Sequence, residues 1–93
     1  MKNWKELTAV LLECSDNMFD AKMKPYVRKW SDPPKAVEVL EVVDYCINGS
    51  LAAGAVVAAL QILYEDRCRA EGTTHEEIVK LATWRTELNA DLK

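Results

Sequence analysis

Glycine, histidine and closely spaced cysteine are scarce in this chain of 93 residues, and each scarcity excludes a class of site. The three glycines are spread through the chain without a G-x-G pair, so the sequence has no glycine-rich loop to hold a phosphate. His75 is the only histidine, and Cys14, Cys46 and Cys68 lie far apart in the sequence, so we expect no zinc site. We therefore expect neither a metal nor a cofactor.

The sequence also lacks the features of an exported or membrane-spanning chain. An odd number of cysteines without C-x-x-C spacing argues against the disulfide framework of a secreted domain. Residues 1–6 run directly into an amphipathic pattern, with neither the apolar core nor the cleavage site of a signal peptide. The longest apolar stretch, residues 51–60, is too short to cross a membrane. The sequence predicts a cytoplasmic protein with no membrane segment.

Low-complexity sequence and internal repeats are absent as well. Apolar residues make up 49% of the chain and charged residues 29%, which are ordinary values for a folded globular protein. The length suits one domain over residues 1–93. The net charge of -3 argues against a dedicated nucleic-acid-binding protein, because such proteins are usually basic.

Apolar residues recur at helical spacing in the first part of the chain. The stripe consists of Trp4, Leu7, Leu11, Cys14 and Met18. Steps of three and four residues predict a helix over residues 3–23 that faces a core, with the first tryptophan inside it. Pro25 disfavours helical geometry at Lys24 and can itself open a short helical turn.

The clearest helix start in the sequence is Ser31-Asp32, followed by two prolines. A side-chain acceptor at either residue can cap the free N–H groups of a helix, and proline is tolerated in its first turn. These signals predict a second helix over residues 33–48. Its apolar face is Ala36, Val39, Leu40, Val43, Cys46 and Ile47, and its polar face is Glu38, Glu41, Asp44 and Asn48.

A third helix is predicted over residues 50–71. Asn48-Gly49 favours a tight turn before it, Ser50 is a good cap, and Gly72 is the usual glycine after a helix end. Helix three is apolar almost all round in its first half, which predicts a central position in the fold.

A fourth helix is predicted over residues 74–91, because Thr74 and Glu77 have the spacing of a capping box. Its inner stripe is Ile78, Leu81, Ala82, Leu88 and Leu92. Four amphipathic segments with short connectors predict an all-α fold, a compact antiparallel four-helix bundle.

The strongest local shift in charge lies in the connector of residues 22–35, which holds five of the 12 basic residues and a single acid. Lysine and arginine neutralise phosphates, and aromatic rings stack on bases. The candidate contacts to a partner or a phosphate are Lys24, Tyr26, Arg28, Lys29 and Trp30. The same residues suit an acidic protein surface. In the alternative interpretation, the two aromatic rings pack beneath the connector and the charges are simply solvated.

A narrow stripe of the third helix combines small and polar residues: Gly54, Ala58, Gln61 and Glu65. Small side chains let another backbone approach closely. The stripe therefore predicts either a homodimer seam or partner-helix groove, or close packing against other helices of the same chain.

The acidic residues Glu38, Glu41 and Asp44 are spaced by three and stack along one helix face, where such rows can hold Mg²⁺. The first two resemble the first E-x-x-E half of the metal site in all-α nucleotide pyrophosphatases of the MazG type. The second half is missing, because Cys68 stands three residues after Glu65, where the family's pattern has aspartate. The resemblance covers two residues and does not assign the chain to that family.

The sequence thus predicts a small non-enzymatic protein that acts by binding a protein surface, of the accessory or inhibitor kind, and that forms a homodimer. Trp84 is the tryptophan predicted at an interface, because tryptophan concentrates binding energy when it is desolvated. The alternative function is binding of a nucleotide or single-stranded nucleic acid through the connector. A Mg²⁺-dependent nucleotide hydrolase using Glu38 and Glu41 is the third hypothesis.

Overall fold

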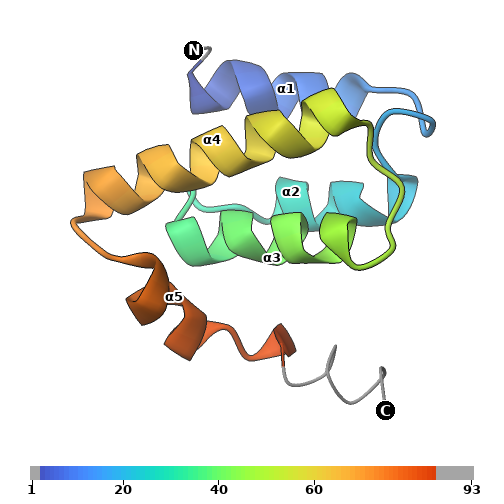
Figure 1. The fold of residues 1–93 in the computed structure, drawn as a ribbon. Helices are drawn as coiled ribbons and strands as arrows, with labels where there is room; N and C mark the ends of the chain where they lie inside the picture. Colours follow the sequence, from blue (N-terminus) through green and yellow to red (C-terminus); the bar gives the residue numbers. More distant parts are fainter. Residues whose placement is uncertain (1–2, 86–93) are drawn as a thin grey trace.

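The computed structural model describes residues 3–85, and within them the chain is all-α, as predicted (Figure 1). The elements in order are α1 (Trp4–Glu13), the short 3-10 helix η1 (Ala21–Met23), α2 (Lys24–Arg28), α3 (Ala36–Ile47), α4 (Gly54–Glu71) and α5 (His75–Leu81). These are five α-helices where four were predicted, so the antiparallel four-helix bundle is not confirmed.

The predicted helix over residues 3–23 is wrong beyond Glu13, where α1 ends. The chain turns there and buries Phe19 completely, at 0% exposure, while its neighbour Met18 is 42% exposed. Phe19 lies beside Ala52 in an isolated antiparallel bridge, the only β-pairing in residues 3–85. In a continuous helix, Met18 would lie on the inner stripe. Because the helix ends at Glu13, the larger side chain of Phe19 is buried in place of Met18.

The connector contains the short helix that Pro25 predicted, because α2 begins one residue before that proline. Capping of α3 by Ser31 or Asp32 was a wrong prediction. The helix begins later than expected, and the Glu38 carboxylate accepts hydrogen bonds from the backbone N–H groups of Ser31 and Lys35, at 3.1 and 2.9 Å. Glu38 thus satisfies N–H groups that precede the helix, and the N–H of Ala36, the first helical residue, donates to the Glu71 carboxylate at 2.6 Å.

α4 has the predicted end but a later start. Ala53 precedes it without a side-chain cap, so the predicted capping by Ser50 is wrong, whereas Gly72 ends the helix in left-handed geometry (φ 68°) as predicted. Although α4 has 18 residues, no helix within residues 3–85 is long and apolar enough to cross a membrane.

α5 begins as predicted and ends early. The Thr74 hydroxyl accepts a hydrogen bond from the Glu77 N–H at 3.2 Å. The helix ends at Leu81, which is 62% exposed and not on the inner stripe as predicted. The predicted core residues Leu88 and Leu92 lie outside the described residues.

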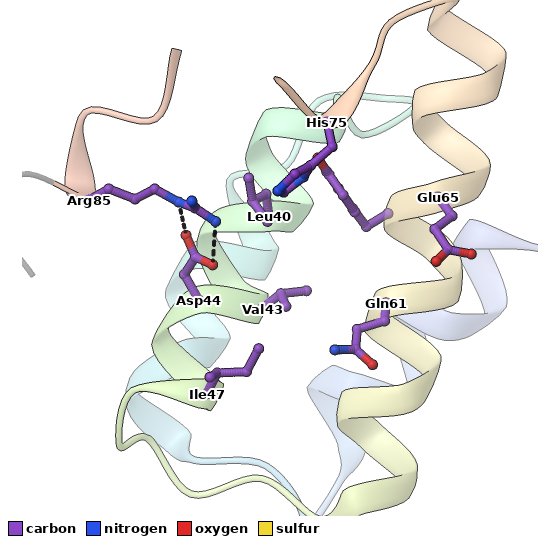
Figure 2. Close-up of a pocket in the computed structure, with 9 residues that line it drawn as sticks. Leu40, Val43, Asp44, Ile47, Gln61, Glu65, His75 and Arg85 are labelled. Carbon is purple, nitrogen blue, oxygen red and sulfur yellow. Dashed lines mark hydrogen bonds and ion pairs between the residues drawn. The ribbon is translucent and has the colours of Figure 1, made fainter. Parts of the chain in front are cut away.

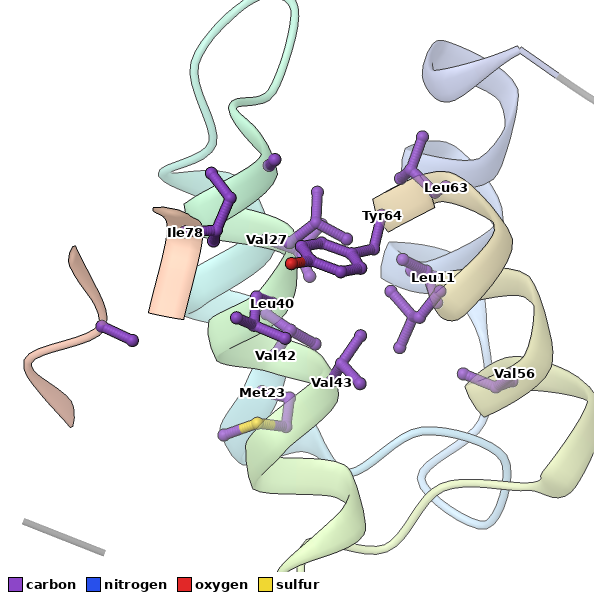
Figure 3. Packing of buried hydrophobic residues seen from close by; sticks show 14 of the residues in the cluster. Leu11, Met23, Val27, Leu40, Val42, Val43, Val56, Leu63, Tyr64 and Ile78 are labelled. Atoms are coloured by element: carbon purple, nitrogen blue, oxygen red, sulfur yellow. The ribbon is translucent and has the colours of Figure 1, made fainter. Parts of the chain in front are cut away.

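The core forms mainly where α3 packs against α4, and α1, α2 and α5 cover it from different sides (Figures 1 and 3). Val42 and Asp44 of α3 are buried in addition to the predicted apolar face, while Ile47 is exposed at the end of the helix. Trp4 is half-buried and packs against the core. The largest fully buried side chains are Phe19, Leu11, Leu60, Leu63, Val27, Val39, Val42 and Pro34.

Candidate functional site

A pocket of about 460 Å³ opens between α3 and α4 and is bordered by the segment that begins with α5 (Figure 2). Its volume is within the range of small-molecule and side-chain binding sites. The lining residues are Leu40, Val43, Asp44, Ile47, Gln61, Tyr64, Glu65, His75 and Arg85. Apolar side chains of α3 form one wall, and polar side chains stand around the opening.

Asp44 is the buried charge of this pocket, at 7% exposure. Its carboxylate accepts hydrogen bonds from the Trp84 indole N–H at 2.8 Å and from Nε and Nη2 of Arg85 at 2.7 and 3.1 Å. A buried carboxylate is stabilised only when it is paired and hydrogen-bonded, and both conditions are met here. The three side chains fasten the turn after α5 to the middle of α3.

This contact corrects two predictions. The sequence pattern predicts Asp44 on a solvated polar face and Trp84 at an exposed interface. Both are buried, because the chain after α5 folds back over α3 and brings a cation and an indole N–H to the carboxylate.

Tyr64 and His75 make the second polar contact of the pocket. The phenol oxygen lies 2.6 Å from Nδ1, and the rings meet edge to face with centroids 5.7 Å apart. Burial raises the pKa of the Tyr64 phenol far above its usual value, and a hydrogen bond with the Cys68 thiol raises it further. The phenol therefore keeps its proton, and the imidazole tautomer decides whether the phenol donates to Nδ1 or accepts from it.

The predicted stripe of α4 reaches this pocket. Gly54, Ala58, Gln61 and Glu65 are all exposed, and the last two line the opening. Open space surrounds the position of a Cβ at Gly54. Ile47, which is 60% exposed, stands at the other side of the opening. The stripe and the pocket therefore form one continuous surface.

The predicted connector site is divided between structural and exposed residues. The Lys24 ammonium donates to the Cys14 carbonyl at 2.6 Å, which holds α2 under the end of α1. Tyr26 packs against Tyr45 with ring centroids 5.4 Å apart.

The other three connector residues differ in exposure. Trp30 is half-buried against the core, and its buried indole N–H has no partner within the described residues. Arg28 and Lys29 are exposed. The connector therefore brings Arg28 and Lys29 to the surface, leaves Tyr26 37% exposed, and uses Lys24 and Trp30 for contacts within the fold.

The acidic row of α3 does not form a metal site in the described part of the chain. Glu38 caps its own helix and Asp44 holds Arg85, so both carboxylates have protein donors. No group of three or more histidine, cysteine, aspartate or glutamate side chains within residues 3–85 is placed to hold a metal ion.

A second hollow of about 270 Å³ lies between α1 and α4. Its lining is apolar throughout: Leu7, Val10, Leu11, Cys14, Met18, Ala55, Val56 and Ala59. This hollow can bury apolar surface of a partner, but it has no polar groups to fix how the partner binds. The pocket beside α5 has such groups and is therefore the better candidate site.

Sequence reasoning missed the polar residues of the pocket: Asp44, Tyr64, His75 and Arg85. One signal was present, because Asp44 interrupts a run of residues that are otherwise mostly apolar between Val39 and Ile47. Its partners lie 40 and 41 positions later, and no local pattern connects them.

The chain matches no family model, no curated protein and no solved structure. The functional conclusion therefore depends on the pocket itself.

Proposed function

We propose that this protein is a non-enzymatic protein-binding module whose binding surface is the pocket between α3 and α4 together with the exposed stripe of α4. The observation that carries the proposal is the continuity of an apolar recess with small, exposed residues. A partner helix can approach the backbone closely at Gly54 and Ala58 and insert an apolar side chain beside Ile47.

The polar contacts of the pocket support binding rather than catalysis. The Asp44 carboxylate is occupied by Trp84 and Arg85, so it is not placed to act as a general base. The Tyr64 phenol keeps its proton because burial raises its pKa, and it is therefore a poor nucleophile. Both contacts instead fasten the α5 segment and give the pocket a fixed shape.

A homodimer is the simplest partner arrangement for this surface, because a twofold axis would bring the stripe of one copy against that of another. Light scattering coupled to size exclusion on the full chain tests it. We expect a dimer that Ala58→Arg converts to a monomer and that Ala70→Arg leaves intact. Both alanines are exposed on α4, but only the first belongs to the stripe. A monomeric wild-type chain would restrict the proposal to a different partner.

Selection from a displayed library of helical peptides tests the wider proposal without assuming a natural partner. We expect selected peptides to lose binding to Ala58→Arg and to keep binding to Ala70→Arg. Peptides that bind both variants equally would place the interaction elsewhere and overturn the proposal.

A second function, binding of nucleotides or single-stranded nucleic acid, is favoured by one observation. Arg28 and Lys29 are exposed side by side, and neither takes part in the ion pairs of the described residues, Lys24–Asp16 and Asp44–Arg85. Binding through phosphates would weaken steeply with salt. We expect an oligonucleotide to change the fluorescence of Trp30 at low salt in a protein where Trp4 and Trp84 are replaced by phenylalanine. An unchanged signal counts against this function.

A further inference from the structure

We propose that the pocket between α3 and α4 binds the carboxyl-terminal residue of a polypeptide that ends in an apolar side chain. The inference rests on the proposed protein-binding function and names the chemistry of the partner. It follows from the way polar groups divide around the pocket: donors stand on the side of the α5 segment, acceptors stand on α4, and apolar side chains lie between them.

The donor side is formed by the Arg85 guanidinium, and His75 also lines the pocket from the α5 segment. A guanidinium has five N–H donors, and Asp44 engages two of those of Arg85, which leaves three for a ligand. The side chain is 34% exposed and lines the pocket, so these donors are accessible. N–H donors of this kind suit a carboxylate.

The acceptor side consists of Gln61 and Glu65, which line the pocket from α4. Their side-chain oxygens can accept an amide N–H. The last residue of a polypeptide carries both groups, a carboxylate on one side of its side chain and an amide N–H on the other. A simple fatty acid has no N–H to donate to Gln61 or Glu65, and the charge of Glu65 would repel its carboxylate. The donors on one side and the acceptors on the other therefore favour the carboxyl-terminal residue of a peptide.

The wall between the two sides is apolar and selects the side chain. Leu40, Val43 and Ile47 line it, and Ile47 is exposed enough to cover a ligand. A leucine-sized side chain buried against this wall loses contact with water, whereas a charged side chain would exchange its hydration for apolar neighbours. The expected ligand therefore ends in leucine, isoleucine, valine or methionine.

A ligand-side comparison tests the inference on the unmodified full chain. Three peptides are titrated while backbone and indole N–H signals are followed by nuclear magnetic resonance: N-acetyl-glycyl-glycyl-leucine, the same peptide with an amidated carboxyl end, and N-acetyl-triglycine. We expect saturable shifts at residues 40–47, at residues 61–65 and at the Trp84 indole with the first peptide. Amidation or loss of the leucine side chain should weaken binding at least about tenfold.

Two matched variants locate the site. Ile47→Asp places a negative charge at the pocket, where it repels a carboxylate, and Leu81→Asp places one at a similarly exposed apolar residue of α5 that does not line it. Neither side chain is in the core, so both variants should fold. We expect the first to abolish binding of the leucine peptide and the second to leave it unchanged.

The outcomes separate this inference from the proposed function. Equal binding of the acid and the amide overturns the role of the carboxyl end, and unchanged binding to Ile47→Asp overturns the assignment of the ligand to this pocket. Failure of all three peptides, with selected helices still binding through Ala58, overturns the inference and leaves the proposed function standing. Failure of both kinds of ligand overturns both.

Discussion

The two ends of α4 are joined to the rest of the chain by different kinds of contact. At its start, Asp20 N–H donates to the Leu51 carbonyl at 2.7 Å and Ala53 N–H donates to the Met18 carbonyl at 2.8 Å, while Phe19 fills the space beneath. These are backbone bonds around a buried ring.

At the other end of α4, side-chain polar groups make the connections. Tyr64 meets His75, Arg67 donates to the Pro34 carbonyl at 2.9 Å, and Glu71 accepts from the Ala36 N–H at 2.6 Å. Beyond them, Asp44 holds Arg85. The first junction depends on apolar burial and should set the stability of the whole fold. The second depends on individual polar pairs and should control the α5 segment and the pocket.

The largest effect should come from Phe19→Ala. Removing a fully buried aromatic ring leaves a cavity, so we expect the free energy of unfolding to fall by about 3–5 kcal/mol in urea titrations. Met18→Ala is the control, since the neighbouring side chain is exposed and its loss should cost less than about 0.5 kcal/mol. Similar losses for both would contradict the account of this junction.

Asp44→Asn should have the next largest effect, because it removes the charge that pairs with Arg85 in a buried position. We expect a loss of about 2 kcal/mol in the same titration; the partial exposure of Arg85 reduces the full cost of a broken buried pair. Asp16→Asn serves as the control, since its carboxylate is exposed and lies 3.9 Å from Lys24. A loss no greater than the control's would mean that the pair does not hold the α5 segment.

Tyr64→Phe should destabilise the α5 segment more than the core. It removes the hydrogen bonds of the phenol with His75 and with the Cys68 thiol, which together are worth about 1–2 kcal/mol. Hydrogen exchange should therefore accelerate at the amides of α5 and change little in α3. Uniform acceleration across both helices would show that the two junctions are not separable.

The smallest effect concerns the reactivity of the Cys46 thiol and needs no substitution. Burial, aided by the negative charge of Asp20, raises the pKa of this thiol from 9.0 to about 11. At pH 9 only about 1% of this thiol is then ionised, and the thiolate is the reactive form. We expect slow alkylation in the folded protein that rises as the pH approaches 11, and rapid alkylation at pH 9 in urea, as measured by peptide mass spectrometry. Equal rates in both states would disprove the shift.

Local signals in the sequence predicted a good part of the fold. The helix stop at Gly72, the cap at Thr74, the turn at Pro25 and the apolar face of α3 from Ala36 to Val43 depend on neighbouring residues alone, and the structure has all of them. The end of α1 was not predictable in the same way. The apolar periodicity of the sequence continues past Glu13. The helix ends there because the turn that follows buries Phe19 in the core, which depends on the packing of distant residues.

The candidate site was less predictable than the fold. The sequence identified Gln61 and Glu65 through the stripe of α4, because helical spacing shows which residues share a face. It did not identify Arg85 as the partner of Asp44, because 41 positions separate them.

By itself the sequence determined an all-α chain, the end of α4 at Gly72, the start of α5 at Thr74 and a small-residue stripe, since propensity, capping and periodicity act within a few residues. Only the tertiary structure decided which charge is buried, which aromatic rings lie in the core and where the pocket opens. The packing of the helices decides which side chains come into contact. A buried polar group lowers the stability of the fold unless another group hydrogen-bonds to it, so burial of Asp44 depends on residues distant in the sequence.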